Sequence, residues 1–339
     1  MMNAKVPFGV AYFPVQGIHA TRDYAFLLLD QFTLLAFGAA LEPLRIANQL
    51  AQKPLYCTRT LSEGGAAVQS SSGVLLQVDG ALDDLPPDTT LVVCAGAMNG
   101  TPATARTLAR ISRHLRFGGT VIGICTGAIT LARAGVLTGK RFTLHWENQP
   151  AFRERFFGLT PTERKFEKDG KVLTSGGGAA ATDLMMSLIG DDFGDDFVLM
   201  VADMCLHRAD TVAGTTQRSS LGASIGCRNP SVVNAVKMMQ ANIEAPLSVD
   251  AIASLQAVSR RQLERLFKEH LGVSPGQCYR NLRLDHGRSL LLETDLAIRE
   301  IALACGFAAS DHFASLFRAR FGTPPSKMLS LRRRDAVAA

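Results

Sequence analysis

The chain has 339 residues and a formal net charge of +6, and 47% of its residues are hydrophobic. This length allows two domains with sizeable cores, and the hydrophobic content excludes a chain that is disordered throughout. No apolar run reaches the ~20 residues that a membrane helix needs, and the N-terminus lacks the pattern of a secretory signal peptide. We therefore expect a cytoplasmic protein that makes no contact with a membrane.

Seven cysteines are scattered along the sequence. An odd number without regular spacing is typical of reduced thiols rather than of a disulfide framework. The sequence has no CxxC pair and no close Cys/His spacing, so we expect neither a structural zinc site nor another cofactor.

Apolar runs alternate with helical patterns through the first part of the chain. Continuous apolar runs predict buried strands at 24–29, 90–95 and 119–124. Shorter strands are predicted at 55–61, 74–78 and 140–144 and a hairpin-like pair at 164–174, with helices at 33–51, 102–117, 126–135 and 146–156 and a helical region that ends near His207. This alternation predicts an α/β fold with a mostly parallel sheet.

One turn in this region carries a reactive side chain. The strand at 119–124 leads into Gly123-Ile124-Cys125-Thr126-Gly127 and then into a helix. Such a sharp turn directs its central side chain over the sheet edge, where open α/β sheets bind ligands, and the helix N-terminus is expected to lower the pKa of a thiol placed there. We predict a ligand pocket around Cys125, Thr126, His145, Gly96 and Ala97. The alternative is a buried cysteine in a tight turn, with His145 in the core.

Residues 211–230 separate two regions of different composition. They are rich in Gly, Ser, Thr and Arg, which is typical of a linker. From residue 231 onward the pattern is helical, and this part holds 15 Lys and Arg against 10 Asp and Glu, whereas residues 1–230 hold 21 against 20. A basic excess there suits a polyanion-binding module, although an ordinary solvated surface would carry it equally well.

A repeat lies within the helical region. LERLFKEHLGVSP at 263–275 aligns without a gap with FASLFRARFGTPP at 313–325. Each copy is an amphipathic helix stopped by glycine and then proline, and a shorter helix containing Ile252 or Ile301 precedes it. Two short helices joined by a tight turn and written twice predict a pair of helix-turn-helix units.

The two predicted recognition helices, 260–270 and 310–320, differ in the side chains that they expose. The first helix begins in a capping-box pattern at Ser259. Residues at the start of a recognition helix enter the major groove, where arginine forms two hydrogen bonds with guanine and glutamine forms two with adenine. Its candidate base readers are Arg260, Arg261, Gln262 and Arg265. The second opens on alanine, so we expect more positioning than base readout from Ser310, His312, Ser315 and Arg318. A helical bundle with solvated arginines, or a dimerisation module, is the alternative.

Residues 24–205 resemble the ThiJ/PfpI superfamily, with its flavodoxin-like, class I glutamine-amidotransferase-like fold. The resemblance rests on GICTG at the elbow, on His145 in LHW, and on TSGGGAAATDLMMSLI. In enzymatic members, an acidic residue near the start of the first helix touches the elbow cysteine, and aligning FTLLAFGAALEPLRIAN on that pattern places Ala36 there. The resemblance therefore implies a pocket for binding with no catalytic residues.

Residues 233–329 resemble the AraC/XylS DNA-binding domain, through LSVDAIA, SRRQLERLFKEHLGVSP, LRLDHGRSLLLETDLAIREIALACGF and HFASLFRARFGTPPSKM. The combination of both domains resembles the GlxA-type regulators, some of which respond to amino acids or to quaternary amines. The resemblance implies a ligand-sensing domain at 1–210, a linker at 211–230 and a DNA-binding domain at 231–339.

The expected function is therefore that of a sequence-specific transcriptional regulator, an activator, controlled by a small metabolite. Its expected partners are double-stranded DNA, the effector, a second copy of the chain and RNA polymerase. Two alternatives remain open at this point. One is an active cysteine hydrolase, amidotransferase or glyoxalase-like enzyme fused to a DNA-binding domain, and the other is a redox sensor that uses Cys125.

Overall fold

The computed structural model divides into two compact units, residues 1–217 and 218–339. It describes residues 6–7, 9–13, 15, 20–97, 100–207, 227 and 229–330. The predicted linker at 211–230 therefore lies almost entirely outside the described residues. Within them, no helix combines the length and the apolar character needed to cross a membrane.

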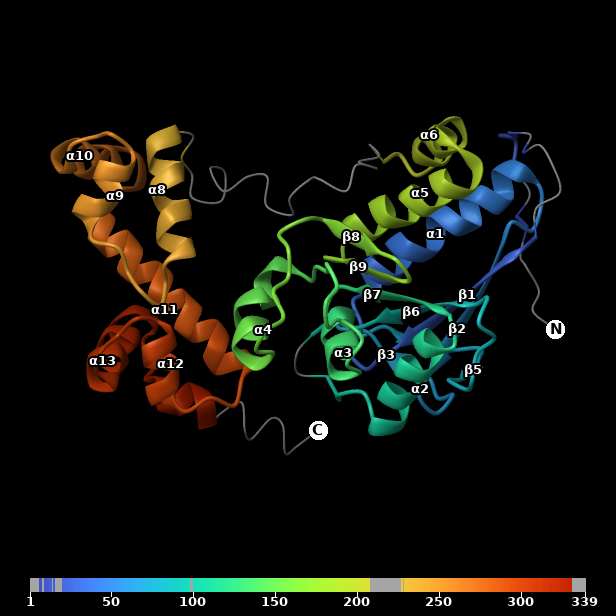
Figure 1. Ribbon diagram of the computed structural model, residues 1–339, viewed down its shortest axis with the longest axis horizontal. Helices are drawn as coiled ribbons and strands as arrows, with labels where there is room; N and C mark the ends of the chain where they lie inside the picture. Colours follow the sequence, from blue (N-terminus) through green and yellow to red (C-terminus); the bar gives the residue numbers. More distant parts are fainter. Residues whose placement is uncertain are drawn as a thin grey trace. The chain divides into compact units, whose positions relative to one another are not determined.

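In the N-terminal unit, strands and helices alternate along the chain (Figure 1). Its elements are β1 (Arg22–Leu28), α1 (Leu34–Ala51), β2 (Tyr56–Ser62), β3 (Val68–Gln69), β4 (Leu75–Leu76), β5 (Gly80–Ala81), β6 (Thr90–Cys94), α2 (Ala105–Arg116), β7 (Thr120–Ile124), α3 (Gly127–Arg133), the 3-10 helix η1 (Trp146–Asn148), α4 (Gln149–Arg155), β8 (Phe166–Asp169), β9 (Val172–Ser175), α5 (Ala180–Phe193) and α6 (Asp195–Met204).

The main sheet has the strand order β5-β2-β1-β6-β7-β9-β8. Every neighbouring pair is parallel except β8 and β9, which form an antiparallel hairpin. The predicted α/β fold with a mostly parallel sheet is thus confirmed. Because β6 and β7 are parallel neighbours, the segments that follow them meet at the same edge of the sheet.

Hydrophobic cores cover both faces of this sheet. Along β1, Tyr24, Phe26 and Leu28 pack on the face covered by α1, α5 and α6. Ala25 and Leu27 alternate with them and pack on the face covered by α2, α3 and α4. Successive side chains of a strand point to opposite faces, which explains why a strand buried on both sides is a continuous apolar run.

One local prediction in this unit is wrong, and the structure divides a second predicted segment. Residues 140–144 form no strand; Thr143 makes only an isolated bridge to Thr162, and its hydroxyl donates to the carbonyl oxygens of Thr162 and Arg164 at 2.9 Å each. The helical region before His207 is two helices, because Gly194 adopts a φ of 86° between α5 and α6. Side-chain hydrogen bonds and a left-handed glycine interrupt what hydrophobicity alone would continue.

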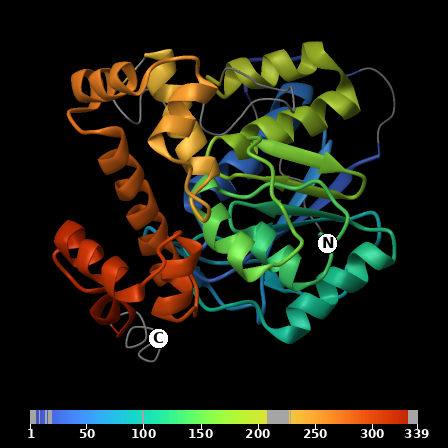
Figure 2. The same ribbon diagram turned by 60° about the vertical axis from the view of Figure 1, so that its left-hand side comes forward.

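The C-terminal unit is helical throughout its described part, and its long helix α11 connects two smaller helical groups (Figure 2, orange to red). Its elements are α8 (Pro230–Ala241), α9 (Val249–Leu255), α10 (Arg260–Leu271), α11 (Pro275–Glu293), α12 (Ile298–Ala304) and α13 (Ser310–Phe321). The helix pairs α9/α10 and α12/α13 are the two predicted helix-turn-helix units.

Side chains of α11 contact both helix-turn-helix units of the C-terminal part. The Tyr279 hydroxyl lies 3.2 Å from the N–H of Leu247, from which it accepts a hydrogen bond. The Arg283 guanidinium donates to the carbonyl oxygens of Cys305 at 2.7 Å and of Gly306 at 2.6 Å. Gly306 has a φ of 72°, and a Cβ there would lie 2.7 Å from the Ile243 carbonyl oxygen. The turn of the second unit therefore packs directly on the loop between α8 and α9.

Candidate functional site

Cys125 occupies a strained turn at the carboxyl end of β7. Its φ is +58°, which is uncommon for a residue other than glycine. Its backbone N–H donates to the carbonyl oxygen of Ser175 at 2.9 Å, so the end of β9 fixes the turn. The residue is 7% exposed. The predicted elbow is therefore present, but its thiol lies beneath the surface.

Close backbone approaches surround the thiol. At Gly177, which has a φ of 84°, a Cβ would lie 2.6 Å from the Cβ of Cys125. The Thr126 hydroxyl donates to the carbonyl oxygen of Gly96 at 2.8 Å. The N–H of Ala97 donates to a carbonyl oxygen in the loop between β1 and α1. The fold thus gathers Cys125, Thr126, Gly96 and Ala97 at one sheet edge, as predicted.

The partner of the thiol is Thr33, whose hydroxyl donates to Sγ of Cys125 over 3.8 Å. The placement of Ala36 opposite the cysteine stays a prediction, and both residues belong to the same buried cluster. Thr33 is the N-cap of α1, whereas Ala36 lies in the first turn and is buried in the core. Among the described residues, the Thr33 hydroxyl is the group that hydrogen-bonds to the sulfur.

The thiol environment differs from the one expected at a helix N-terminus. Burial raises the pKa of Cys125, and this effect exceeds the lowering by the Thr33 hydroxyl and the Thr126 backbone. The expected lowering of its pKa is therefore wrong. Cys94, at the end of the neighbouring strand β6, interacts electrostatically with Cys125, and burial raises its pKa as well. Neutral thiols are poor nucleophiles, and burial disfavours the thiolate form of both cysteines.

His145 is the N-cap residue of the short helix η1. The two residues that follow it, Trp146 and Glu147, lie close to its imidazole ring. Its Nδ1 lies 3.9 Å from the Glu147 carboxylate, and its ring lies 5.4 Å from that of Trp146, centroid to centroid. Burial lowers the pKa of His145, and Glu147 partly opposes this. The carboxylate of Glu147 also raises the pKa of Cys125, so one negative charge influences both predicted pocket residues.

Sequence reasoning missed Thr33, Gly177, Trp146 and Glu147. Trp146 and Glu147 could have been noticed, because an aromatic and an acidic residue follow His145 directly. Thr33 and Gly177 are distant in sequence from Cys125, and their proximity to it follows from the packing of α1 and of the loop after β9.

A buried carboxylate lies one turn beyond the glycine loop. Asp183, in the first turn of α5, is almost fully buried. Lys165 lies 3.3 Å and His207 2.7 Å from its carboxylate oxygens. His207 is the last described residue before the predicted linker. These contacts connect the glycine loop beside Cys125 with the end of the N-terminal unit. No group of metal-ligating side chains of sufficient size occurs within the described residues.

The first candidate recognition helix is α10, and its start is fixed as predicted. The Ser259 hydroxyl accepts a hydrogen bond from the N–H of Gln262 at 3.1 Å. Leu263 and Phe267 are fully buried and hold the helix on its own core. Arg261, Gln262 and Arg265 are exposed on the other face. Three of the four predicted base readers are therefore free to meet a nucleic acid.

Arg260 is placed differently. Its guanidinium donates to Glu264 at 2.9 Å, one turn along α10, and to Asp250 on α9 at 3.0 Å. These ion pairs join the two helices of the unit. Base contact would require the Arg260 guanidinium to leave both carboxylates, and the side chains of these ion pairs are about half exposed.

The second candidate recognition helix, α13, begins at Ala309 without a side-chain cap. His312, Ser315 and Arg318 are exposed and Ser310 is half-buried, as a surface for phosphate or base contacts would need. Arg320 is held by Asp285 of α11 at 2.7 Å. The two copies of the repeat therefore differ in the structure as well. The start of α10 is capped by a side chain and exposes Arg261 and Arg265, whereas the start of α13 has no side-chain cap.

The fold and these two regions define a DNA-binding transcriptional regulator whose α/β domain carries the cysteine elbow. Residues 26–190 match the DJ-1/PfpI family, and residues 252–330 match a helix-turn-helix domain family. The chain belongs to the AraC family of HTH-type transcriptional regulators, to the group that carries a DJ-1/PfpI domain.

Full-length relatives support this assignment. The chain is 40% identical over 315 residues to the HTH-type transcriptional regulator GlxA of Rhizobium meliloti (strain 1021), covering 91% of this chain and 95% of the relative. It is 38% identical over 304 residues to the HTH-type transcriptional regulator GbdR of Pseudomonas aeruginosa (strain UCBPP-PA14), covering 90% and 83%. A crystal structure of a THiJ/PfpI family protein from Pseudomonas syringae shares the fold, with a TM-score of 0.50, 19% identity, and coverage of 66% of this chain and 87% of that one.

Proposed function

We propose that this regulator is controlled by a small metabolite with a positively charged ammonium group, an amino acid or a quaternary amine, which binds at the elbow without being chemically changed. The observation that carries the proposal is the setting of Cys125: a buried thiol with a raised pKa, hydrogen-bonded to the Thr33 hydroxyl. Nucleophilic catalysis requires a thiolate and a partner that handles its proton. A neutral thiol beside a hydroxyl is suited to lining a pocket.

The charge and the aromatic surface at this edge support a cationic ligand. Glu147 is the acidic group that acts on both Cys125 and His145. Trp146 is 42% exposed and offers an indole face. An ammonium group over an indole beside a carboxylate gains a cation–π interaction as well as a coulombic one.

For the DNA-binding unit, we propose that Arg261, Gln262 and Arg265 read base edges in the major groove. Their exposure at the capped start of α10 supports this assignment. We assign to Arg260 the role of bracing α9 against α10, with a secondary role in DNA contact. On α13, the exposed His312, Ser315 and Arg318, with Ser310, would mainly position the second unit on the backbone of the next groove.

Ligand control requires that the two domains respond to one another. We propose that the response passes from the loop at Gly177 through α5 to the Asp183–His207 pair and into the linker at 211–230. The direct approach of Gly177 to Cys125 and the 2.7 Å contact between His207 and Asp183 support this route. We also propose that the regulator works in the cytoplasm as a homodimer and activates transcription through contact with RNA polymerase. Sedimentation of the full chain with and without operator tests the dimer.

A thermal-shift screen of the full chain tests the ligand proposal. The screen would use glycine betaine, carnitine, choline and the standard amino acids, with neutral amides as controls. A ligand at ~100 times its Kd stabilises the folded state by about 2.7 kcal/mol, which is a shift of several degrees. Glu147→Gln should abolish the shift, and Glu163→Gln, an equal charge change at an exposed position, should keep it. A flat response to all cations would refute the proposal.

A further inference from the structure

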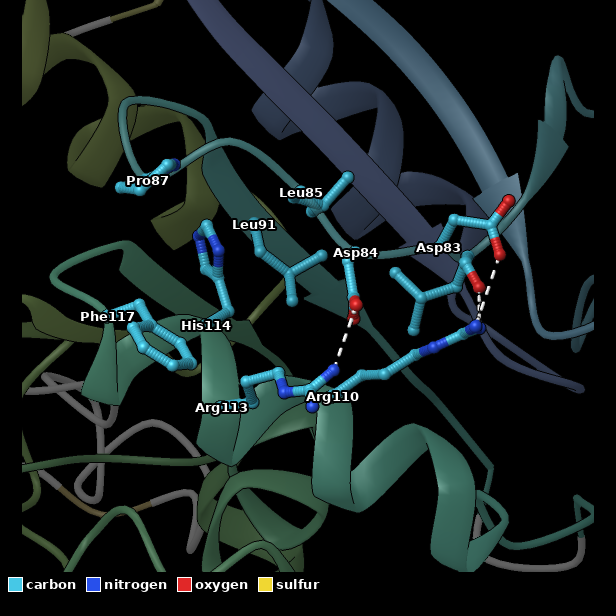
Figure 3. Close-up of a pocket in the computed structure, with 10 residues that line it drawn as sticks. Asp83, Asp84, Leu85, Pro87, Leu91, Arg110, Arg113, His114 and Phe117 are labelled. Atoms are coloured by element: carbon cyan, nitrogen blue, oxygen red, sulfur yellow. Dashed lines mark hydrogen bonds and ion pairs between the residues drawn. The ribbon is translucent and has the colours of Figure 1, made fainter.

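A pocket lies in the N-terminal unit, at the opposite edge of the sheet from the elbow. It is formed by the segment that leads into β6 and by the end of α2, just before β7. Its volume is about 330 Å³, within the range of small-molecule sites. It is lined by Leu82, Asp83, Asp84, Leu85, Pro87, Leu91, Arg110, Arg113, His114 and Phe117 (Figure 3).

The deepest polar group of this pocket lacks a partner on one side. His114 is 6% exposed. Its Nε2 lies 2.9 Å from the Thr89 carbonyl oxygen, which can only accept, so Nε2 carries a proton and donates it. Its Nδ1 is buried and makes no hydrogen bond within the described residues. A buried nitrogen without a hydrogen bond is unfavourable, and a bound molecule with a suitable polar atom would remove that cost.

The remaining wall combines apolar side chains with two arginines, Arg110, which is mostly buried and bound to Leu82 and Asp83, and Arg113, which is more exposed. In the view of Figure 3, Pro87, His114 and Phe117 lie at one end of the pocket and the Arg110–Asp83 pair at the other. Arg113 donates to Asp84 at 2.9 Å, and both side chains of that pair are more than half exposed. Exposed ion pairs of this kind contribute little, so a ligand anion can replace Asp84 on the guanidinium.

From this combination we infer that the pocket binds a small organic acid, with its carboxyl group between Arg113 and Nδ1 of His114 and its apolar body against Leu85, Leu91 and Phe117. One proton lies between the ligand carboxyl oxygen and Nδ1, and it satisfies the orphaned nitrogen in either position. This site is separate from the elbow, because its residues lie at the amino ends of β6 and β7 whereas Cys125 lies at the carboxyl end of β7.

The surroundings of His114 set the pH dependence of this binding. Burial lowers its pKa, and Lys171 contributes in the same direction, so the free ring is neutral at pH 7. The carbonyl groups of Thr89, Thr120 and Leu85 favour the protonated ring but do not outweigh burial. Arg110 and Arg113 add positive charge from α2, and Asp83 and Asp84 add negative charge from the facing segment. A bound carboxylate brings a further negative charge, so binding takes up a proton and strengthens as the pH falls.

Isothermal titration of the full chain with sodium benzoate tests this inference, with benzamide as the uncharged analogue. We expect binding of benzoate, no comparable binding of benzamide, and higher affinity at pH 6 than at pH 8. Arg113→Gln should weaken benzoate binding about tenfold or more, as the loss of a charge-assisted hydrogen bond implies. Arg106→Gln, on the same helix but outside the pocket, should stay within about twofold of the wild type on that argument.

Two further variants locate the site. His114→Gln should remove the pH dependence, and Glu147→Gln, at the elbow, should leave benzoate binding unchanged. If His114→Gln fails to fold, the Arg113→Gln and Arg106→Gln comparison decides alone. Absence of benzoate binding at millimolar concentration, undiminished binding in Arg113→Gln, or loss of binding in Glu147→Gln would each overturn the inference.

Discussion

The substitution Arg283→Met offers a direct test of how the two helix-turn-helix units are held together. Arg283 projects from α11 and donates to the carbonyl oxygens of Cys305 and Gly306 at 2.7 and 2.6 Å. Its guanidinium also lies 4.0 Å from the ring centroid of Phe307. Methionine keeps an apolar stem of similar length but removes the charge and every donor.

The expected loss of stability follows from these contacts. Hydrogen bonds to a charged group contribute about 1.5–3 kcal/mol each, and a partly desolvated cation–π contact adds about 1 kcal/mol. Because the interactions share one side chain they are not additive, so we expect a loss of about 3 kcal/mol in the free energy of unfolding of the C-terminal unit. With a urea dependence of ~1.5 kcal/mol per molar, the midpoint falls by about 2 M.

The sequence provides a convenient assay. Trp146 is the single tryptophan of the chain and lies in the N-terminal unit, so its fluorescence reports the unfolding of that unit alone. Far-UV circular dichroism reports both units. We expect the circular-dichroism midpoint to fall in Arg283→Met, while the fluorescence midpoint stays unchanged. Arg280→Met is the matched control, since Arg280 is exposed on the same helix.

The reasoning fails if Arg283→Met unfolds at the same urea concentration as Arg280→Met. It also fails if the fluorescence and circular-dichroism midpoints fall together by equal amounts, because the effect would then not be local to the C-terminal unit.

Three other outcomes are expected. In gel shifts with a selected operator, Arg261→Ala and Arg265→Ala should each weaken binding about 10-fold or more, whereas Arg260→Ala should change it less; equal losses at all three would contradict the bracing role. Cys125→Ser should leave operator binding intact while altering the effector response in a reporter assay. An unaltered response would show that the thiol does not contact the effector. The pKa of His145 is lowered, so a cationic effector should bind with constant affinity near pH 7 and lose affinity only as acid adds a like charge; calorimetric affinity that rises below pH 6 would contradict this sign.

Local patterns in the sequence determined most of the secondary structure and the separation into an α/β domain and a DNA-binding domain. Continuous apolar runs predicted β1, β6 and β7, because a strand that is covered on both faces has apolar side chains at successive positions. The fifty-residue repeat marked the two helix-turn-helix units, and Ser259 marked the start of α10 through a hydrogen bond that spans only three residues. Features of this kind depend on neighbours in the chain, so the chain alone specifies them.

Long-range packing decided the rest. The sequence could not tell that the Thr33 hydroxyl contacts Cys125, since this depends on where α1 begins relative to β7. It favoured a lowered thiol pKa from the helix that follows, whereas tertiary burial raises it. It also counted Arg260 as a free base reader, although a carboxylate on another helix, Asp250, engages it. Ionisation and availability of a side chain depend on which distant groups surround it, and only the folded structure brings those groups together.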